Sequence, residues 1–275
     1  MKIGLAQIDC LPEDRDKNIS KFYKFAAQAK SEGCDVVAFP EMSDTGYITS
    51  LIPKSAQTWS GSAYKQASSA ARSNAINLVC GISEKRDSAV YNSVACFDRA
   101  GQLIAHYRKI HLFSPAPVHE DRFFKAGDKI CTAQIGGLKW GISICFDLRF
   151  PEIYRYQTVQ GAEILLNCTA WPNIRSSHWE HLTRARAIEN QAFFVGAARV
   201  GTDGDLTFNG HSRIVSPSGE IIVDGSSSKE ELVVGDIDIE SLINFRNAIP
   251  AISLRRDDIY GNFNIIPFFC KTEVS

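Results

Sequence analysis

The sequence lacks an excess of charge of either sign. Its 30 Lys and Arg residues are balanced by 31 Asp and Glu residues, which gives a net charge of −1 over 275 residues. No basic run is present. Proteins that bind nucleic acid carry clustered basic side chains that neutralise phosphates. We therefore expect no nucleic acid partner.

Long apolar runs are also missing. No apolar segment approaches the roughly 20 residues that a helix needs to cross a bilayer. The N-terminal stretch MKIGLAQID shows no apolar core of the kind that a secretory signal contains. The sequence therefore predicts a soluble cytoplasmic protein with no membrane partner.

The eight cysteines show no paired spacing. They lie at positions 10, 34, 80, 96, 131, 145, 168 and 270, without a CxxC pair or a nearby pair of histidine ligands. This spacing argues against a zinc site and against a disulfide framework. Because several of the cysteines fall inside apolar strand-like runs, we expect reduced core residues and no bound metal.

What the sequence does contain is an alternation of strand-like and helix-like segments. With 44% hydrophobic and 22% charged residues, a chain of this length can bury a large core. Short apolar runs predict strands, and apolar residues at helical spacing predict helices. Strands are expected at 2–9, 36–39, 78–83, 90–97, 103–107, 138–144, 164–167, 193–198, 212–215, 220–223 and 232–237, and helices at 18–31, 64–73, 151–160 and 178–190.

The order of these segments indicates an α/β fold. Two βαβ-like sets, each followed by further strands, predict two sheets packed together with helices outside. No linker or low-complexity run separates the sets, so we expect a single domain over residues 1–275. An irregular segment at 110–128, rich in His, Pro and Phe, has the length of a functional loop.

Cys145 lies at the junction between a predicted strand and a predicted helix. The strand at 138–144 ends directly before it, and Pro151 opens the helix that follows. A side chain on such a sharp turn faces outward, near unpaired backbone N–H groups that favour a thiolate or an oxyanion. Free cysteine is also among the most buried residue types, so position alone leaves a packed structural cysteine open.

Three charged residues lie where chemistry is expected in such a sheet. Glu41 follows the strand at 36–39, and open α/β sheets carry their sites at the carboxyl ends of strands. Lys109 follows a later strand, and Glu120 lies in the irregular segment. Taken singly, Glu41 is equally well a helix or turn cap, and the other two are ordinary surface charges.

The order Glu41, Lys109, Glu120 and Cys145 resembles that of the nitrilase superfamily of carbon–nitrogen hydrolases. Four ordered motifs at compatible spacing are specific, whereas each motif alone is weak. The resemblance covers essentially the whole chain. The matching pieces are FPEM at 39–42, YRKIHLF at 107–113, Glu120 ahead of FFKAGD at 123–128, CFDLRFPE at 145–152, and stretches at 178–191 and 210–213.

The resemblance implies a four-layer αββα sandwich, commonly paired as a dimer, and a hydrolase that needs no cofactor. It implies that Cys145 attacks an amide carbonyl to form a thioester and that Glu41 serves as base and then acid. Lys109 and the backbone N–H of Phe146 would stabilise the oxyanion, with Glu120 holding Lys109 and the amide in place. We expect an apolar run at 265–269 to cover a neighbouring subunit.

The residues around the nucleophile favour an amide over a nitrile as substrate. Nitrile-hydrolysing members tend to continue with Trp-Glu-Asn, whereas this chain has FDLRFP at 146–151, as the amidase branches do. The stretch WPNIRSSHW at 171–179 is similar to that of omega-amidases, which release ammonia from dicarboxylate monoamides such as 2-oxoglutaramate. An N-carbamoyl amine or amino-acid amidohydrolase, a nitrilase, and a non-catalytic scaffold member of the fold stay open as alternatives.

Six residues are candidates for binding a small amide substrate. Arg175 is a candidate clamp for a distal carboxylate, since a guanidinium matches that planar anion, although a surface role is equally compatible. The other five are candidate pocket walls: Tyr47, Phe124, Phe146, Trp171 and His178. We assign Arg149 to a partly buried ion network with Glu152, Arg186 and Glu189, and His111 is not needed for the chemistry.

Overall fold

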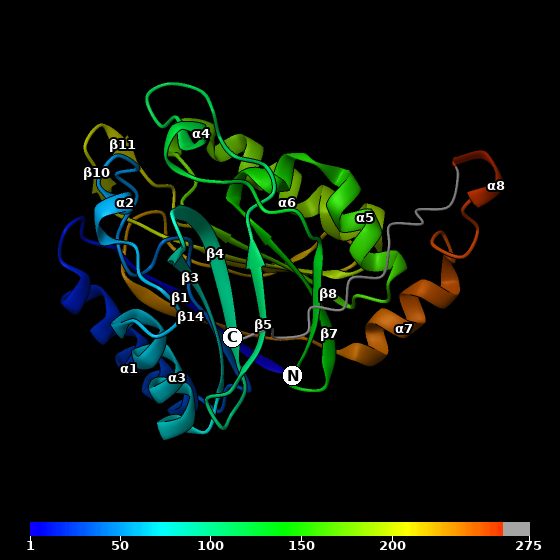
Figure 1. Cartoon of the computed structure of the whole chain (residues 1–275). Helices are drawn as coiled ribbons and strands as arrows, with labels where there is room; N and C mark the ends of the chain where they lie inside the picture. Colours follow the sequence, from blue (N-terminus) through cyan, green and yellow to red (C-terminus); the bar gives the residue numbers. More distant parts are fainter. Residues whose placement is uncertain (261–275) are drawn as a thin grey trace.

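Two six-stranded sheets pack against each other at the centre of the molecule, and helices cover their outer faces (Figure 1). The computed structural model describes residues 1–260. The strand order is β14-β1-β2-β3-β4-β5 in the first sheet and β13-β12-β9-β8-β7-β6 in the second. The predicted αββα sandwich is confirmed. The apolar run at 265–269 lies outside the described residues.

The strands of both sheets are short and mostly buried. The first sheet consists of β1 (Lys2–Gln7), β2 (Val36–Ala38), β3 (Asn77–Arg86), β4 (Ala89–Phe97), β5 (Leu103–Arg108) and β14 (Glu231–Asp236). The second consists of β6 (Cys131–Ile135), β7 (Leu138–Ile144), β8 (Ile164–Thr169), β9 (Phe193–Ala198), β12 (Arg213–Val215) and β13 (Ile221–Asp224). A small hairpin is formed by β10 (Thr202–Asp203) and β11 (Leu206–Thr207).

The helices divide between the two outer faces, as Figure 1 shows. On the first sheet lie α1 (Arg15–Ser31) and α3 (Ser62–Asn74), and on the second lie α5 (Pro151–Val159) and α6 (Ser176–Asn190). The other helices are α2 (Ile52–Ser55), α4 (Glu120–Phe123), α7 (Ile239–Ala248), α8 (Asp257–Tyr260), and the short 3₁₀ helices η1 (Cys145–Arg149) and η2 (Asn173–Arg175). No helix within residues 1–260 has both the length and the apolar character to span a membrane.

Helix α1 illustrates how the sequence pattern produces an element. Its buried apolar residues recur every three or four positions, at Ile19, Phe22, Phe25, Ala26 and Ala29, which puts them on one face of the helix. The side chain of Asp14 accepts a hydrogen bond from the backbone N–H of Lys17 and caps the N-terminus. The apolar face packs on the first sheet in a cluster with β1, β2 and α3.

The core between the sheets is apolar and draws on both of them. One cluster joins Val36, Val79 and Val94 of the first sheet to Ile142 and Leu166 of the second. All five side chains are fully buried. Burial of this kind contributes about 25 cal/mol per Å² of apolar surface, so the two sheets stabilise each other.

Both sheets have parallel strands at their centres. Strands β1, β2 and β3 run parallel in the first sheet, and β7, β8 and β9 run parallel in the second. The carboxyl ends of parallel strands meet at one edge of a sheet. Residues that follow β2, β7 and β8 are therefore brought to one end of each sheet.

Several elements were missing from the sequence prediction, namely strand β6, the β10–β11 hairpin, helices α2, α7 and α8, and the short helical turns α4, η1 and η2. Strand β6 is only five residues long and its pattern is mixed. Helix α7 buries only Leu242 among its ten residues, so its sequence carries little helical periodicity. The segment at 110–128 is irregular as predicted, except that it contains the one-turn helix α4.

Candidate functional site

The four residues of the predicted constellation meet in one buried place. Glu41 follows β2, Lys109 follows β5, Glu120 begins α4, and Cys145 follows β7. Their side chains are at most 6% exposed. Residues separated by up to 104 positions in the chain (145 − 41) therefore form one site.

Lys109 lies between the two carboxylates. Its Nζ donates to Oε1 of Glu41 and to Oε1 of Glu120, each at 2.9 Å. All three side chains are buried, with exposed fractions of 0–1%. A buried charge is tolerated only when it is paired and hydrogen-bonded, and here every charge is.

Further donors fix both carboxylates. Nδ2 of Asn92 donates to Oε1 of Glu41 at 2.6 Å and to Oε1 of Glu120 at 3.1 Å. The remaining oxygen of Glu41 accepts from the backbone N–H of Ala170 at 2.8 Å. Glu120 also accepts from the hydroxyl of Tyr47 at 2.8 Å and from the backbone N–H of Phe113 at 2.7 Å.

Burial and neighbouring charges set the protonation of the site. Burial raises the pKa of the Glu41 carboxyl, and the Lys109 ammonium opposes part of that shift. Burial alone would lower the pKa of Lys109, but the carboxylates of Glu120 and Glu41 hold it well above its ordinary range. Burial and the Glu41 carboxylate raise the pKa of the Cys145 thiol. The resting Cys145 side chain is therefore a neutral thiol, which would need a base to become a thiolate.

Cys145 occupies a tight turn that a neighbouring aspartate holds in place. Its φ is +41°, a left-handed conformation that is rare for a residue with a side chain. Oδ2 of Asp147 accepts from the backbone N–H of Ile144 at 3.0 Å and from the hydroxyl of Tyr107 at 2.7 Å. Oδ1 of Asp147 accepts from the backbone N–H of His111 at 3.0 Å. These contacts stabilise the turn that presents the sulfur.

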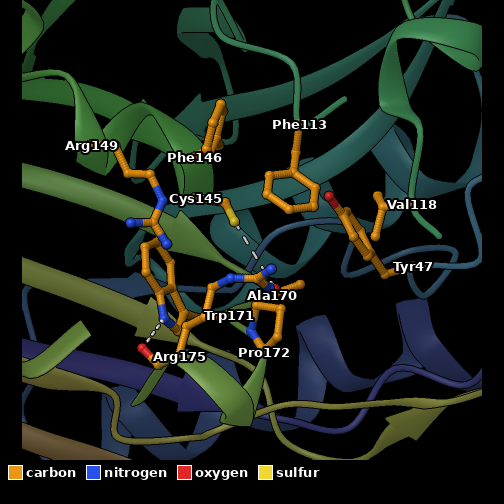
Figure 2. Close-up of a pocket in the computed structure, with 10 residues that line it drawn as sticks. All are labelled: Tyr47, Phe113, Val118, Cys145, Phe146, Arg149, Ala170, Trp171, Pro172 and Arg175. Carbon is orange, nitrogen blue, oxygen red and sulfur yellow. Dashed lines mark hydrogen bonds between the residues drawn. The ribbon is translucent and has the colours of Figure 1, made fainter. Parts of the chain in front are cut away.

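The sulfur of Cys145 opens into a small pocket (Figure 2) with about 330 Å³ of empty space, part of it open to solvent. Sγ lies 4.0 Å from the carbonyl oxygen of Ala170, whose N–H binds Glu41. Ala170 therefore contacts both the Cys145 thiol and the Glu41 carboxylate. The pocket is lined by Tyr47, Phe113, Val118, Cys145, Phe146, Arg149, Ala170, Trp171, Pro172 and Arg175.

Four of the six predicted substrate-binding residues line this pocket, namely Tyr47, Phe146, Trp171 and Arg175. Phe124 instead packs in an apolar cluster beside Met42 and Tyr47. His178 is exposed on α6, and its Nδ1 is 3.2 Å from Nη1 of Arg149. Both residues therefore lie behind side chains of the pocket wall.

Arg149 does not belong to the ion network that the sequence suggested. Its guanidinium lies 4.9 Å from the ring centroid of Trp171 and faces the pocket. Of that network only one ion pair forms: Nη1 of Arg186 pairs with Glu189 at 2.8 Å, and Nη2 of Arg186 donates to the carbonyl of Leu148 at 2.8 Å. Glu152 is exposed and forms no ion pair among the described residues.

The two pocket arginines are half-buried, and among the described residues neither forms an ion pair with a carboxylate. The guanidinium of Arg175 lies 5.4 Å from the ring centroid of Phe113. Burial lowers the pKa of Arg149, and the positive charge of Arg175 acts in the same direction. The pocket therefore presents positive charge to whatever enters it. Within residues 1–260, no three His, Cys, Asp or Glu side chains are grouped to hold a metal ion.

Comparison with known proteins identifies the family. The family described as carbon-nitrogen hydrolase matches residues 2–247, which is most of the chain. This chain belongs to the carbon–nitrogen hydrolase family. The predicted family and enzyme class, a hydrolase that acts on amides, are thereby confirmed.

Relatives of this hydrolase cover it almost end to end. The 2-oxoglutaramate amidase of Bacillus subtilis (strain 168) is 33% identical over 259 residues, which cover 94% of this chain and 98% of that protein. Omega-amidase NIT2 of Homo sapiens is 31% identical over 272 residues, which cover 94% of this chain and 96% of that protein.

Solved structures of the superfamily share the fold of the hydrolase. Saccharomyces cerevisiae Nit3, of the nitrilase superfamily, superposes with a TM-score of 0.86 at 28% identity, covering 93% of this chain and 96% of that one. An amidase from Nesterenkonia sp. gives a TM-score of 0.85 at 26% identity, covering 94% and 95%. A mutant of that amidase carries the acetamide moiety of fluoroacetamide, added covalently at its active site cysteine.

The hydrolase also uses residues that the sequence analysis did not single out. Asn92 bridges both carboxylates, Asp147 holds the turn at Cys145, and Phe113 lines the pocket. Asp147 lies inside the CFDLRFPE motif, two residues after Cys145, so its position was a usable signal. Asn92 gave no such signal, because it and Ser93 are ordinary polar residues inside a mostly apolar strand.

Proposed function

We propose that this hydrolase is an omega-amidase that releases ammonia from the terminal amide of a short dicarboxylate monoamide, such as 2-oxoglutaramate. One observation carries the proposal. A buried thiol with a carboxylate and an ammonium behind it opens into a pocket whose wall holds Arg149 and Arg175, neither of them ion-paired within the described residues. The named relatives include a 2-oxoglutaramate amidase and omega-amidases.

In the first step Glu41 takes the thiol proton while Cys145 attacks the amide carbonyl carbon. The carboxylate and the sulfur both contact Ala170, which supports this transfer. The raised pKa of Glu41 brings it closer to that of its proton donor, which favours general base catalysis. A C–S bond forms, and the carbonyl oxygen becomes an oxyanion.

The oxyanion needs donors that are already in place. We assign this role to Nζ of Lys109, with the backbone N–H of Phe146 as second donor. Nζ is held by Glu41 and Glu120 and stays protonated because of them. A preorganised donor of this kind is typically worth about 3–4 kcal/mol in the transition state.

Collapse of the intermediate completes the reaction in two stages. The proton on Glu41 passes to the leaving nitrogen, the C–N bond breaks, and ammonia leaves a thioester on Cys145. Glu41 then deprotonates a water molecule, which attacks the thioester, and the sulfur recovers its proton as the acid product leaves. Glu120, fixed by Tyr47 and Phe113, holds Lys109 through both stages.

The two arginines select the far end of the substrate. We propose that Arg175 binds the distal carboxylate and that Arg149 adds a second positive charge beside it. Tyr47, Phe146 and Trp171 form the walls. Phe124 supports Tyr47 within one apolar cluster, and His178 orients Arg149.

Ammonia release from a small panel tests this function. The panel holds succinamate, glutaramate, 2-oxoglutaramate and N-carbamoyl-β-alanine, with Cys145→Ala as the control. We expect turnover of the dicarboxylate monoamides and none in the control. Turnover of the carbamoyl compound alone would show that the substrate assignment is wrong and that the enzyme is an N-carbamoyl amidohydrolase. Activity of the Cys145→Ala control would show that Cys145 is not the nucleophile.

We further propose that residues 1–275 form a single domain that works as a homodimer in the cytoplasm. The apolar cluster that joins both sheets supports the single domain.

Ile188 on α6 and Ile243 on α7 are about half exposed, at 49% and 53%, and offer apolar surface to a second copy. Cys10, Cys34, Cys80, Cys145 and Cys168 are buried free thiols, which suits a reducing compartment. Light scattering that gives the mass of one chain would exclude the dimer.

A further inference from the structure

Thr169 is a buried hydroxyl residue next to the nucleophile. It is the last residue of β8, and its side chain is 0% exposed. Its Oγ1 has no hydrogen-bond partner within the part of the chain that the structure describes. Burial of a polar atom without a partner lowers the stability of a protein by about 1–3 kcal/mol. The unpaired Thr169 hydroxyl therefore suggests a functional role.

The register of the second sheet places Thr169 beside Cys145. Strands β7 and β8 are parallel, with Ser143 opposite Asn167 and Ile144 opposite Cys168. The side chains of Ser143 and Asn167 lie on one face, because Nδ2 of Asn167 donates to Oγ of Ser143 at 3.0 Å. Thr169 follows Asn167 by two residues in β8, where the two-residue period of a strand returns its side chain to that same face. Cys145 begins the turn directly after β7, next to this end of β8.

The position of the sulfur agrees with this register. Sγ of Cys145 lies 4.0 Å from the carbonyl oxygen of Ala170, the residue directly after Thr169. Sγ therefore lies next to the C-terminal end of β8, where Thr169 is the last residue. A thiolate is the acceptor that would satisfy the hydroxyl.

We infer that the Thr169 hydroxyl donates a hydrogen bond to Sγ of Cys145 and stabilises the thiolate form of the nucleophile. Burial raises the pKa of the Cys145 thiol, and the Thr169 hydroxyl lowers it. Because Thr169 touches the reacting sulfur, it is a catalytic residue in this assignment. The inference rests on the proposed role of Cys145 as the nucleophile.

The hydroxyl acts twice in each turnover. When Glu41 takes the thiol proton, the negative charge left on sulfur is met by the Thr169 O–H. When the C–S bond of the thioester breaks, the electron pair returns to sulfur, and the same O–H stabilises it until the proton comes back from Glu41. Both acylation and deacylation therefore depend on this one donor.

Two substitutions separate the hydroxyl from the shape of the side chain. Thr169→Val keeps the volume and removes the donor, whereas Thr169→Ser keeps the donor and removes a methyl group. Thr183→Val is the matched control: Thr183 is also fully buried, but its hydroxyl donates to the carbonyl of Glu180 on α6. The charged groups that act on the sulfur, Glu41, Lys109, Glu120 and Arg149, are unchanged in all three variants.

The measurement is the rate at which iodoacetamide alkylates Cys145, followed by peptide mass spectrometry at one neutral pH, beside kcat and KM for the amide. We expect Thr169→Val to lower the alkylation rate and kcat about tenfold, the size of one hydrogen bond to a charged group, with KM unchanged. Thr169→Ser and Thr183→Val should stay within about twofold of the parent, since neither removes that donor.

Alkylation of Thr169→Val at the parent rate would overturn the inference, and so would a Thr169→Ser variant as slow as Thr169→Val. If Thr169→Val does not fold by circular dichroism, Thr169→Ala supplies a second variant without the hydroxyl and is judged by the same rates. Failure of the proposed function has a different signature, because it appears as ammonia release that survives Cys145→Ala.

Discussion

The charged groups on the two sides of the pocket differ in burial and in pairing. On the side of Glu41, Lys109 and Glu120, every charge is buried and paired within the protein. On the side of Arg149 and Arg175, the guanidinium groups are half-buried and, within the described residues, have no carboxylate partner. The first side is complete before a substrate arrives, and the second would be completed by the carboxylate that we propose to bind there.

This difference indicates that one side acts on the transition state and the other recognises the substrate. A charged group that must act on a transition state gains from being fixed in advance, because no reorganisation is then needed during the reaction. A charged group that must recognise a ligand gains from being unpaired, because it does not have to give up a partner. We therefore expect substitutions on the first side to change kcat and stability, and those on the second to change KM.

The largest expected effect is loss of the base. Glu41→Gln keeps the shape of the side chain and removes the proton acceptor, so kcat should fall by about three to four orders of magnitude. The value of kcat is measured by steady-state ammonia release. The matched control is Glu84→Gln, another buried carboxylate, which binds Arg108 and Ser93 away from the pocket. Equal losses in both variants would mean that the loss of any buried carboxylate inactivates the enzyme.

Removal of the central ammonium should cost stability as well as activity. Lys109→Met leaves two buried carboxylates facing each other, and breaking a buried ion pair destabilises a protein by about 3–5 kcal/mol. Arg175→Met, on the other side of the pocket, should change the free energy of unfolding by less than about 0.5 kcal/mol. Urea denaturation measures both, and similar losses in the two variants would contradict the comparison.

The arginine side should respond through substrate binding. Arg175→Ala should raise KM for 2-oxoglutaramate about 10- to 100-fold, which is the range for a lost hydrogen bond between charged groups. It should leave turnover of an uncharged amide such as propionamide unchanged. Arg184→Ala is the control, since Arg184 lies on α6 and contacts Glu180 at 3.9 Å. An unchanged KM would exclude Arg175 as the carboxylate clamp.

The smallest expected effect is a shift in pH dependence. Burial raises the pKa of Glu41 above its ordinary value of 4.5, and the amide of Asn92 opposes the shift by donating to the charged form. The base must be deprotonated, so kcat/KM falls as pH drops through this raised pKa. In Asn92→Ala the pKa rises further, and the acid limb should move to higher pH. Asn190→Ala, which removes a buried asparagine of α6, should leave the limb in place.

Much of the fold and the reacting side could be predicted from the sequence alone. Apolar runs and helical spacing located most strands and the four helices that cover the sheets, α1, α3, α5 and α6. Glu41 and Cys145 follow strands directly, which is where the topology of an α/β sheet places a site. Their meeting with Lys109 and Glu120 rested on the resemblance of ordered motifs.

The residues that were missed depend on contacts that no local pattern encodes. Asn92 reaches both carboxylates because β4 pairs with β5, which puts its carbonyl opposite the backbone N–H of Lys109 at 2.8 Å. Strand register of this kind is a tertiary property. Arg149 was assigned to an ion network because its neighbours in sequence are charged, whereas the turn at Cys145 directs it to the pocket.

The pairing of one ammonium with two carboxylates has a consequence for the whole reaction cycle. Glu41, Glu120 and Lys109 together carry one net negative charge beside a neutral thiol. In the proposed mechanism that charge moves from Glu41 to sulfur, then to the oxyanion, and returns to Glu41, while water enters and ammonia leaves as neutral molecules. The total charge on Glu41, Glu120, Lys109, the sulfur and the reacting amide group therefore stays constant through the proposed cycle, so the chemical steps need no counter-ion. Added salt should weaken capture of the anion by the arginines and leave turnover at saturation unaffected.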